Sequence, residues 1–415
     1  MKKKMKKAVY KFIKCEGITA TIAAMVILIV FIKAALIERQ DVAIIDWAMF
    51  TSIVVALLLN SFSKMFRTLL MNKLEDSVKL TCDYEKLMKK YECEMVAYKN
   101  EAASCKYVKK VLKNRDTEVV HIPVVREKTF RNGKIEIQDS RAKYVLPQMI
   151  CEHFGELFEA HSTSTVYNQL AIRVDDWEME NGKFVIKTSR TTYFDSLVTN
   201  RAMDFCWSNG LTIREQFEYG PYLHGLKESC LSNHLGFNGF IESSDGYIVL
   251  MKRGNKLSIG KGTYGSSVGA SLKAKYALID GKFTREGLRK GILKEIENEL
   301  KISEEGLEAF SLDEHLIAAY RDLVEGGKPQ LLFYIKSKWP KDKIETNFFE
   351  KIKGVEKSKK YELLEDGRRF LWISQKDIKE KKICILPDQI VYDGRPYHMM
   401  PSVAASIVML TEYLK

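Results

Sequence analysis

Two apolar runs near the start of the chain constrain its fold more than any other feature. Residues 18–37 are apolar apart from Lys33 and two threonines, and residues 42–62 form a second apolar run of similar length. Twenty helical residues rise about 30 Å, which matches the hydrocarbon core of a bilayer. Since only four residues separate the runs, the sequence predicts a transmembrane hairpin, with a buried soluble helical hairpin as the alternative.

Basic residues are unevenly distributed around the two runs, and the net charge of the chain is +12. Seven lysines crowd the first fourteen residues, and Lys64, Arg67 and Lys73 follow the second run, whereas the connecting loop holds only Arg39. The positive-inside rule therefore predicts that both termini are cytoplasmic. The eight cysteines are scattered without metal-ligand spacing, which is typical of a reducing compartment.

Two charges lie inside the predicted spans. Lys33 is about one turn before the end of the first span and Asp46 about one turn into the second. An ionised side chain within a bilayer is costly, so we hypothesise that the two pair within or between protomers. Snorkelling of each side chain to the interface is the alternative.

A run without proline or glycine follows the second span, from residue 64 to residue 113. Apolar side chains recur in it at spacings of three and four, which predicts a helical stalk. These residues are Leu80, Tyr84, Leu87, Tyr91, Met95 and Tyr98. The stripe fits either a coiled coil between protomers or a stalk packed on the next domain.

The C-terminal part of the chain shows strand patterns around a glycine-rich segment. Residues 237–242 and 247–252 predict a hairpin with its turn at 243–246. Residues 260–269 are rich in glycine, and residues 331–336 and 369–374 predict further strands, the last followed by a short helix at 375–380. This segment lacks the Gly-Lys-Ser/Thr ending of a P-loop, but its backbone N–H groups could still wrap a phosphate.

The stretch from Gly281 to Ile302 predicts a helix with acidic residues on one face. Glu295, Asn298 and Glu299 are spaced so that they converge on that face, and such oxygen ligands suit Mg²⁺. The whole stretch resembles the Nudix box, in which a glycine and a glutamate precede a helix that reads Arg-Glu-apolar-x-Glu-Glu-x-Gly-apolar. The matching residues are Glu286, Glu295, Ile296, Glu299 and Ile302, whereas Lys294, Asn298 and Lys301 depart from the pattern and Gly281 is one place late.

The resemblance implies a fold and an activity. It implies an α+β Nudix-like core, with a mixed sheet between helices, and Mg²⁺-dependent hydrolysis if the domain is active, with Glu295 and Glu299 in the catalytic role. Because Asn298 replaces a carboxylate and Lys294 cannot form the bidentate fork of arginine, we expect weak or absent hydrolysis. Arg253, Lys261 and Tyr264 lie around the glycine segment, where they could grip a phosphate and stack a base.

The predicted domain order is a basic cytoplasmic N-terminus (1–17), two transmembrane helices (18–37 and 42–62), a helical stalk (63–114), an accessory α/β region (115–235) and a Nudix-like domain (236–415). In the accessory region, residues 119–125 and 184–188 predict strands, with the second continuing to residue 198. Residues 145–158 predict a helix.

This domain order resembles the transmembrane Nudix effectors of bacterial cyclic-oligonucleotide antiphage signalling (CBASS). The resemblance implies an inner-membrane homo-oligomer that binds a cyclic oligonucleotide, disrupts the bilayer and kills the infected cell, with no DNA or RNA polymer as partner. A membrane-anchored Nudix hydrolase of nucleoside diphosphate derivatives is the second hypothesis. A membrane-tethered scaffold with neither activity is the third.

Overall fold

The computed structural model describes residues 79–100, 119–352 and 370–415, except for the single positions 132, 163, 165, 208, 209 and 256. The predicted spans at 18–37 and 42–62, with Lys33 and Asp46, lie outside the described residues. The two ends of the predicted stalk also lie outside them. Where the structure does describe the chain, it contains no helix that is both long and apolar enough to cross a membrane.

The described part of the predicted stalk, residues 79–100, is not one helix, so this prediction was wrong there. It holds the five-residue helix α3 (Tyr84–Met88) and the strand β1 (Met95–Lys99). Strand β1 pairs antiparallel with β2 (Val119–Thr129) and buries Val96 and Tyr98. Sheet pairing has therefore overridden the helical spacing, which is a weak local preference.

The apolar stripe of the predicted stalk packs into the body of the protein. Leu80, Leu87 and Tyr91 are each at most 5% exposed and join a core that includes apolar residues between 150 and 231, Ile259, and Leu323 and Val324. Tyr98 packs into a different core on the central sheet. The described part of the stripe thus belongs to the fold of this chain and presents no continuous face for a coiled coil.

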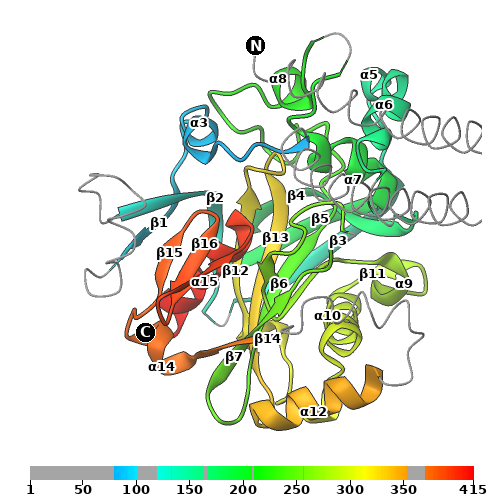
Figure 1. The fold of residues 1–415 in the computed structure, drawn as a ribbon. Coiled ribbons are helices and arrows are strands. Elements are labelled where there is room, and N and C mark those ends of the chain that lie inside the picture. The colour runs from blue at the N-terminus through cyan, green and yellow to red at the C-terminus, as the bar shows by residue number, and fades with distance from the viewer. Residues whose placement is uncertain are drawn as a thin grey trace, which may run out of the picture.

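A large mixed sheet forms the centre of the described structure (Figure 1). Its strand order is β1-β2-β12-β13-β6-β7-β14, and β9 and β8 add to β6 and β7. The pair β13–β6 is parallel and the other pairs are antiparallel. The remaining strands are β12 (Leu316–Asp322), β13 (Lys328–Lys336), β6 (Gly236–Glu242), β7 (Tyr247–Lys252), β14 (Phe370–Ser374), β8 (Tyr264–Gly265) and β9 (Val268–Ser271). The predicted strands at 237–242, 247–252 and 331–336 are confirmed, as is the strand at 369–374 from residue 370, where the described residues resume.

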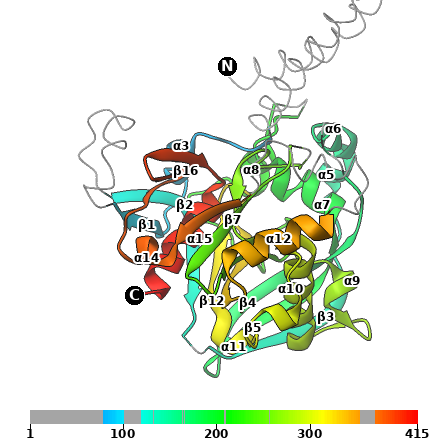
Figure 2. The same cartoon turned by 60° about the horizontal axis from the view of Figure 1, so that its bottom comes forward.

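Helices cover both faces of this sheet (Figures 1 and 2). Alternate residues of β6 and β13 face opposite sides, as strand geometry requires. Phe237 and Phe333 pack toward α10 (Arg285–Leu300) and α12 (Lys341–Ile352), whereas Phe240 packs toward α15 (Pro401–Tyr413). The described chain is therefore an α+β structure with a mixed sheet between helical layers.

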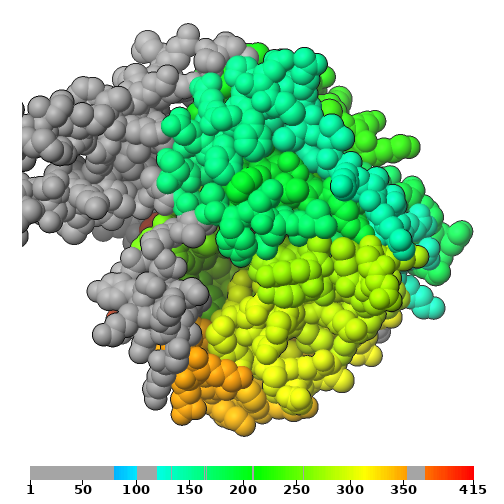
Figure 3. Space-filling model, turned by 90° about the vertical axis from the view of Figure 1, so that its right-hand side faces the viewer, coloured from blue at the N-terminus to red at the C-terminus, as the bar shows by residue number. Residues whose placement is uncertain are grey.

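The accessory region contributes strands to two sheets. Its first strand, β2, belongs to the central sheet. Strands from both sides of the predicted boundary at residue 235 therefore share one sheet. A second sheet of β3 (Ile135–Lys143), β5 (Lys183–Thr192) and β4 (Leu170–Glu180), in that order, packs over the α10 side. Figure 3 shows this region lying against the yellow-green residues around α10, where the N–H of Phe283 donates to Asp139 at 2.8 Å.

Two other predictions in this region need correction. The strand predicted to run to residue 198 ends at Thr192, because Thr192 and Asp195 form a capping box that starts α7 (Tyr193–Val198). The helix predicted over 145–158 is two short helices, α5 (Gln148–Glu152) and α6 (Phe154–Glu159). The 3-10 helix η1 (Asn200–Ala202) and helix α8 (Ile213–Phe217) complete the region.

The remaining elements are short. The segment before α10 holds α9 (Ala274–Ala277), β10 (Leu278–Ile279) and β11 (Lys282–Phe283), and η2 (Glu304–Gly306) and α11 (Leu312–His315) follow it. After β14 come the predicted short helix, α14 (Gln375–Lys379), and a small sheet of β15 (Cys384–Leu386), β16 (Gln389–Tyr392) and β17 (Arg395–His398).

Candidate ligand-binding site

Helix α10 packs unusually close to the segment before it. Thr284 caps the helix, and its Oγ1 accepts from the N–H of Gly287 at 3.1 Å. A Cβ at Gly287 would lie 2.0 Å from the carbonyl oxygen of Ala277, so only glycine permits this approach. The contact holds the second half of α10 beside α9 and β9, and this half carries the predicted site residues.

Glu295 is buried and is paired with a lysine that the sequence did not point to. The Nζ of Lys273 lies 2.7 Å from Oε1 and 3.0 Å from Oε2 of Glu295, which is 1% exposed. Lys273 directly precedes α9, and its backbone forms a β-bridge with Ala171 of β4. The ammonium is thus delivered to Glu295 from a fixed backbone position.

Glu299 lies one turn after Glu295 on the same face of the helix. The N–H of Gly269 donates to its Oε2 at 3.3 Å. Burial, together with the charge of Glu295, raises the pKa of Glu299 to about 7. This carboxyl therefore exchanges a proton near neutral pH, as a group that works by binding or proton transfer would.

Asn298 and Glu286, the other residues of the predicted motif, are directed elsewhere. The Asn298 side chain bonds to Tyr276, and its backbone oxygen accepts from the Nζ of Lys301 at 2.6 Å. Glu286 is exposed and lies 3.5 Å from Arg289. Among the described residues, no group of three or more His, Cys, Asp or Glu could hold a metal ion. The set Glu295, Asn298 and Glu299 does not fit Mg²⁺, because Lys273 already neutralises Glu295.

Three cationic side chains converge on the start of the glycine-rich segment, residues 258–260, which we call the glycine loop. Arg253 donates to the carbonyl oxygens of Ile259 and Gly260, both at 3.2 Å. The Nζ of Lys79 donates to the carbonyl oxygen of Ser258 at 2.6 Å, and Arg201 donates to its Oγ at 2.5 Å. These cations come from three separate parts of the sequence and all bond to the glycine loop.

The other two predicted ligand residues have different surroundings. Lys261 is partly buried, and its charge helps to lower the pKa of the nearby buried His161. The ring of Tyr264 packs edge-on against Tyr397, with centroids 5.5 Å apart, and its backbone bridges to Met399. Tyr264 therefore has a packing contact with the C-terminal segment, and base stacking by this ring stays a prediction.

A chain of buried charges joins the glycine loop to the turn between β12 and β13. Arg201 Nε lies 3.6 Å from Glu325, and Lys328 Nζ lies 3.4 Å from the same carboxylate. These three side chains are between 3% and 13% exposed. Burial, followed by the charge of Glu325, raises the pKa of Asp322 to about 7.

The same chain of charges reaches α10. Burial, and then the charge of Arg201, lower the pKa of Arg253, while Glu299 acts on it in the opposite direction. We call the whole set the buried charged cluster: Arg201, Arg253, Lys273, Lys328, Glu295, Glu299, Asp322 and Glu325. Sequence reasoning found only Arg253, Glu295 and Glu299 of these. Charged residues beside apolar strands, as at Asp322 and Lys328, were the signal that could have indicated two more.

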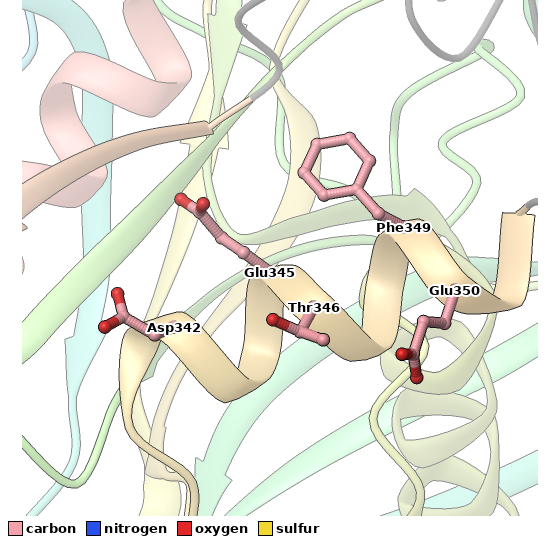
Figure 4. Close-up of a pocket in the computed structure, with 5 residues that line it drawn as sticks. All are labelled: Asp342, Glu345, Thr346, Phe349 and Glu350. Atoms are coloured by element: carbon pink, nitrogen blue, oxygen red, sulfur yellow. The ribbon is translucent and has the colours of Figure 1, made fainter.

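A pocket of about 400 Å³ lies along α12, away from this cluster (Figure 4). The lining residues within the described part of the chain all come from that one helix: Asp342, Glu345, Thr346, Phe349 and Glu350. Three of them are carboxylates, and Glu345 also accepts a hydrogen bond from the indole of Trp372. The described side chains of this pocket are mostly acidic, whereas cations surround the glycine loop, so the buried charged cluster is the better candidate site for an anion.

Comparison with known proteins adds little to this picture. No protein-family model matches the chain, and no curated protein matches it. Among solved structures, the chain is similar to DR0079 from Deinococcus radiodurans, at 11% sequence identity and a TM-score of 0.22. The match covers 36% of this chain and 71% of that one. A similarity of this size carries no argument about fold or function.

Proposed function

We propose that this protein is a membrane-anchored sensor whose Nudix-like body binds an anionic nucleotide, a cyclic oligonucleotide, without hydrolysing it. The observation that carries the proposal is the convergence of Lys79, Arg201 and Arg253 on the glycine loop, next to a helix whose acidic face is already neutralised. Charge-assisted bonds from arginine and lysine are the interactions that phosphate groups require.

Buried cations support an anionic ligand. Burial, and then the charge of Arg201, lower the pKa of Arg253. Burial also lowers the pKa of Lys328, where Glu325 opposes the shift and Arg201 adds to it. Glu325 offsets part of the repulsion between these cations at Arg201 and Lys328, and a phosphate bound beside Arg201 and Arg253 would offset more of it. The guanidinium of Arg201 also lies 5.0 Å from the ring centroid of Tyr193. An aromatic ring near a phosphate site offers a base a surface for stacking.

The state of α10 favours binding over turnover. A Nudix hydrolase needs free carboxylates for its metal, whereas Glu295 is paired with Lys273 and Asn298 is bonded to Tyr276. The membrane part of the proposal rests on the predicted spans at 18–37 and 42–62. In the proposal, ligand binding favours assembly of these hairpins in the inner membrane, where they disrupt the bilayer in an antiphage response.

Binding is tested by calorimetry on the full chain with a panel of cyclic di- and trinucleotides. At least one member of the panel should bind, and Arg201→Met should weaken its affinity at least tenfold, as loss of a buried charge-assisted bond does. Lys290→Met is the matched control, because Lys290 is exposed on α10. No binding by any member, or equal affinities of the two variants, would contradict the proposal.

Membrane disruption is tested separately in bacteria. The full chain should depolarise cells only while a cognate cyclic-nucleotide synthase is active. Deleting residues 18–62 should abolish toxicity and leave ligand binding intact. Toxicity that persists without these residues would defeat the membrane part of the proposal alone.

A membrane-anchored hydrolase is the second candidate, because Glu299 titrates near neutral pH and could act as a base. The test is turnover of ADP-ribose, dinucleoside polyphosphates or NAD with Mg²⁺. A rate of about 1 s⁻¹ or faster, the lower end of ordinary enzymes, that is lost in Glu299→Gln would favour this candidate.

A further inference from the structure

The acidic face of α10 is in contact with a lysine ammonium from outside the helix, that of Lys273. We infer that the Lys273 ammonium takes the place of a divalent metal ion at Glu295 and Glu299, so that this face is folded and neutral without metal. The inference goes beyond the proposed function, since it holds for any ligand that the cluster binds.

The contact geometry supports this substitution. Lys273 Nζ contacts both carboxylate oxygens of Glu295, at 2.7 Å and 3.0 Å, as a cation bound by both oxygens would. Its charge also lowers the pKa of Glu299, against the effects of burial and of Glu295. One ammonium therefore acts on both carboxyl groups of the face.

The position of the lysine is built into the fold. Its backbone bridges to Ala171 in β4 and begins α9, while Gly287 lets α10 approach Ala277. The ammonium also lies 5.7 Å from the ring centroid of Tyr276, the residue that bonds Asn298. The same short segment thus supplies the cation and also holds the Asn298 side chain, whose amide donates to Tyr276.

The net charge of this face also disfavours a divalent metal ion. Glu295 and Glu299 together carry at most two negative charges. Lys273 supplies one positive charge, so little net charge is left to attract a divalent ion. Divalent affinity follows the number of charged oxygen ligands, and this face offers too few while Lys273 is present.

The test measures Mn²⁺ binding by electron paramagnetic resonance, together with thermal unfolding, on the purified full chain. The wild-type protein should show no Mn²⁺ site tighter than ~1 mM that depends on Glu295, and Mn²⁺ should not raise its Tm. Lys273→Met should have a lower Tm, because Glu295 loses its partner, and should bind Mn²⁺ at least tenfold more tightly. Added Mn²⁺ should restore much of the lost Tm.

Two controls separate a latent metal site from general damage. Lys273→Met combined with Glu295→Gln should lose the Mn²⁺ site and should recover Tm without metal. Lys294→Met removes an exposed lysine of the same helix, one that pairs with Glu297 at 2.7 Å, and should behave as wild type.

A wild-type Mn²⁺ or Mg²⁺ site that Glu295→Gln abolishes would overturn the inference. So would a folded Lys273→Met protein with unchanged Mn²⁺ affinity. If Lys273→Met does not fold even with Mn²⁺, the comparison of wild type with Glu295→Gln decides: equal Mn²⁺ binding supports the inference and reduced binding overturns it. No nucleotide is present, so these results are independent of the proposed function.

Discussion

Three glutamates of helix α10 show how far environment decides the behaviour of one residue type. Glu286 is exposed beside Arg289, Glu295 is buried against Lys273, and Glu299 is partly buried with a backbone N–H as its hydrogen-bond donor. Burial, together with the charge of Glu295, raises the pKa of Glu299 to about 7. At the residue scale, the site is therefore defined by its neighbours more than by the spacing of its carboxylates.

Glu299→Gln should change the pH dependence of stability. The raised pKa means that the folded state binds a proton that the unfolded state releases, so this residue makes wild type lose stability as pH rises from about 4.5 to about 7. Glutamine keeps an acceptor for Gly269 and carries no charge. At pH 8 the variant should be more stable by about 1–3 kcal/mol, and at pH 4 the two should be similar.

Denaturant unfolding between pH 4 and pH 8 measures this difference. Glu297→Gln is the matched control, since Glu297 is exposed on the same helix and Lys294 lowers its pKa. The free energy of unfolding of this control should differ little from that of wild type, and the difference should not grow between pH 5 and pH 7. If the unfolding free energies of Glu299→Gln and wild type changed in parallel with pH, this would contradict the assignment of a raised pKa to Glu299.

Lys301 ends α10 in the left-handed conformation, with φ of 62°. A residue with a Cβ is disfavoured there, and glycine is the usual choice. Lys301→Gly should therefore stabilise the protein by about 0.5–1 kcal/mol, although it loses the bond from Nζ to the Asn298 oxygen. Lys301→Ala keeps the strain and loses the same bond, so it should be less stable than the glycine variant. Thermal unfolding distinguishes the two.

At the element scale, the short segment 79–83 ties the accessory region to the glycine loop. Lys79 is fully buried, and its Nζ reaches Ser258 and lies 3.4 Å from Nδ1 of His161. Two residues later, the N–H of Thr81 donates to Asp204 at 2.9 Å. The segment thus fixes the position of the loop whose carbonyl groups face the cations.

Lys79→Met should loosen the glycine loop. It leaves the carbonyl oxygen of Ser258 buried without this donor, which should cost about 1–3 kcal/mol of stability. Hydrogen exchange of the amides around residues 258–262 should become faster than in wild type. The exposed Lys89 offers a control, since Lys89→Met should stay within about 0.5 kcal/mol of wild type. Unchanged exchange in the loop would show that Lys79 does not restrain it.

At the scale of the whole molecule, residues 79–100 contribute to two cores. Leu80, Leu87 and Tyr91 pack beneath the accessory helices, while Val96 and Tyr98 pack on the central sheet. Residues 79–100 are therefore an integral part of the described fold. The start near residue 115 that the sequence suggests would remove strand β1 and expose the edge of β2.

A chain that starts at Lys79 should fold, and one that starts at residue 119 should be much less stable or insoluble. Each of the five large side chains removed contributes about 1.5–3 kcal/mol when fully buried, so the total is comparable with the stability of a whole domain. Circular dichroism and thermal unfolding of the two chains measure the effect. Equal Tm values would show that residues 79–100 are not part of the folded body.

The sequence alone determined the features that depend on neighbouring residues. The hairpin around residues 243–246, the strands at 331–336 and 370–374, and helix α10 were predicted because a turn or a periodicity is encoded within a few positions. The same local reasoning placed Glu295 and Glu299 on one face of α10. It could not supply their partner, because Lys273 is 22 residues from Glu295 and reaches it only after α9 and α10 pack.

Tertiary structure decided the rest, because it depends on contacts between distant residues. The apolar spacing of residues 80–98 suits a helix, yet pairing of β1 with β2 and burial in two cores are worth more than local helix propensity. Arg201 and Glu325 are also far apart in the sequence and meet only through the packing of the accessory region on the β12–β13 turn. The acidic helix could therefore be predicted from the sequence. The positions of the cations that determine what it can bind depend on tertiary packing.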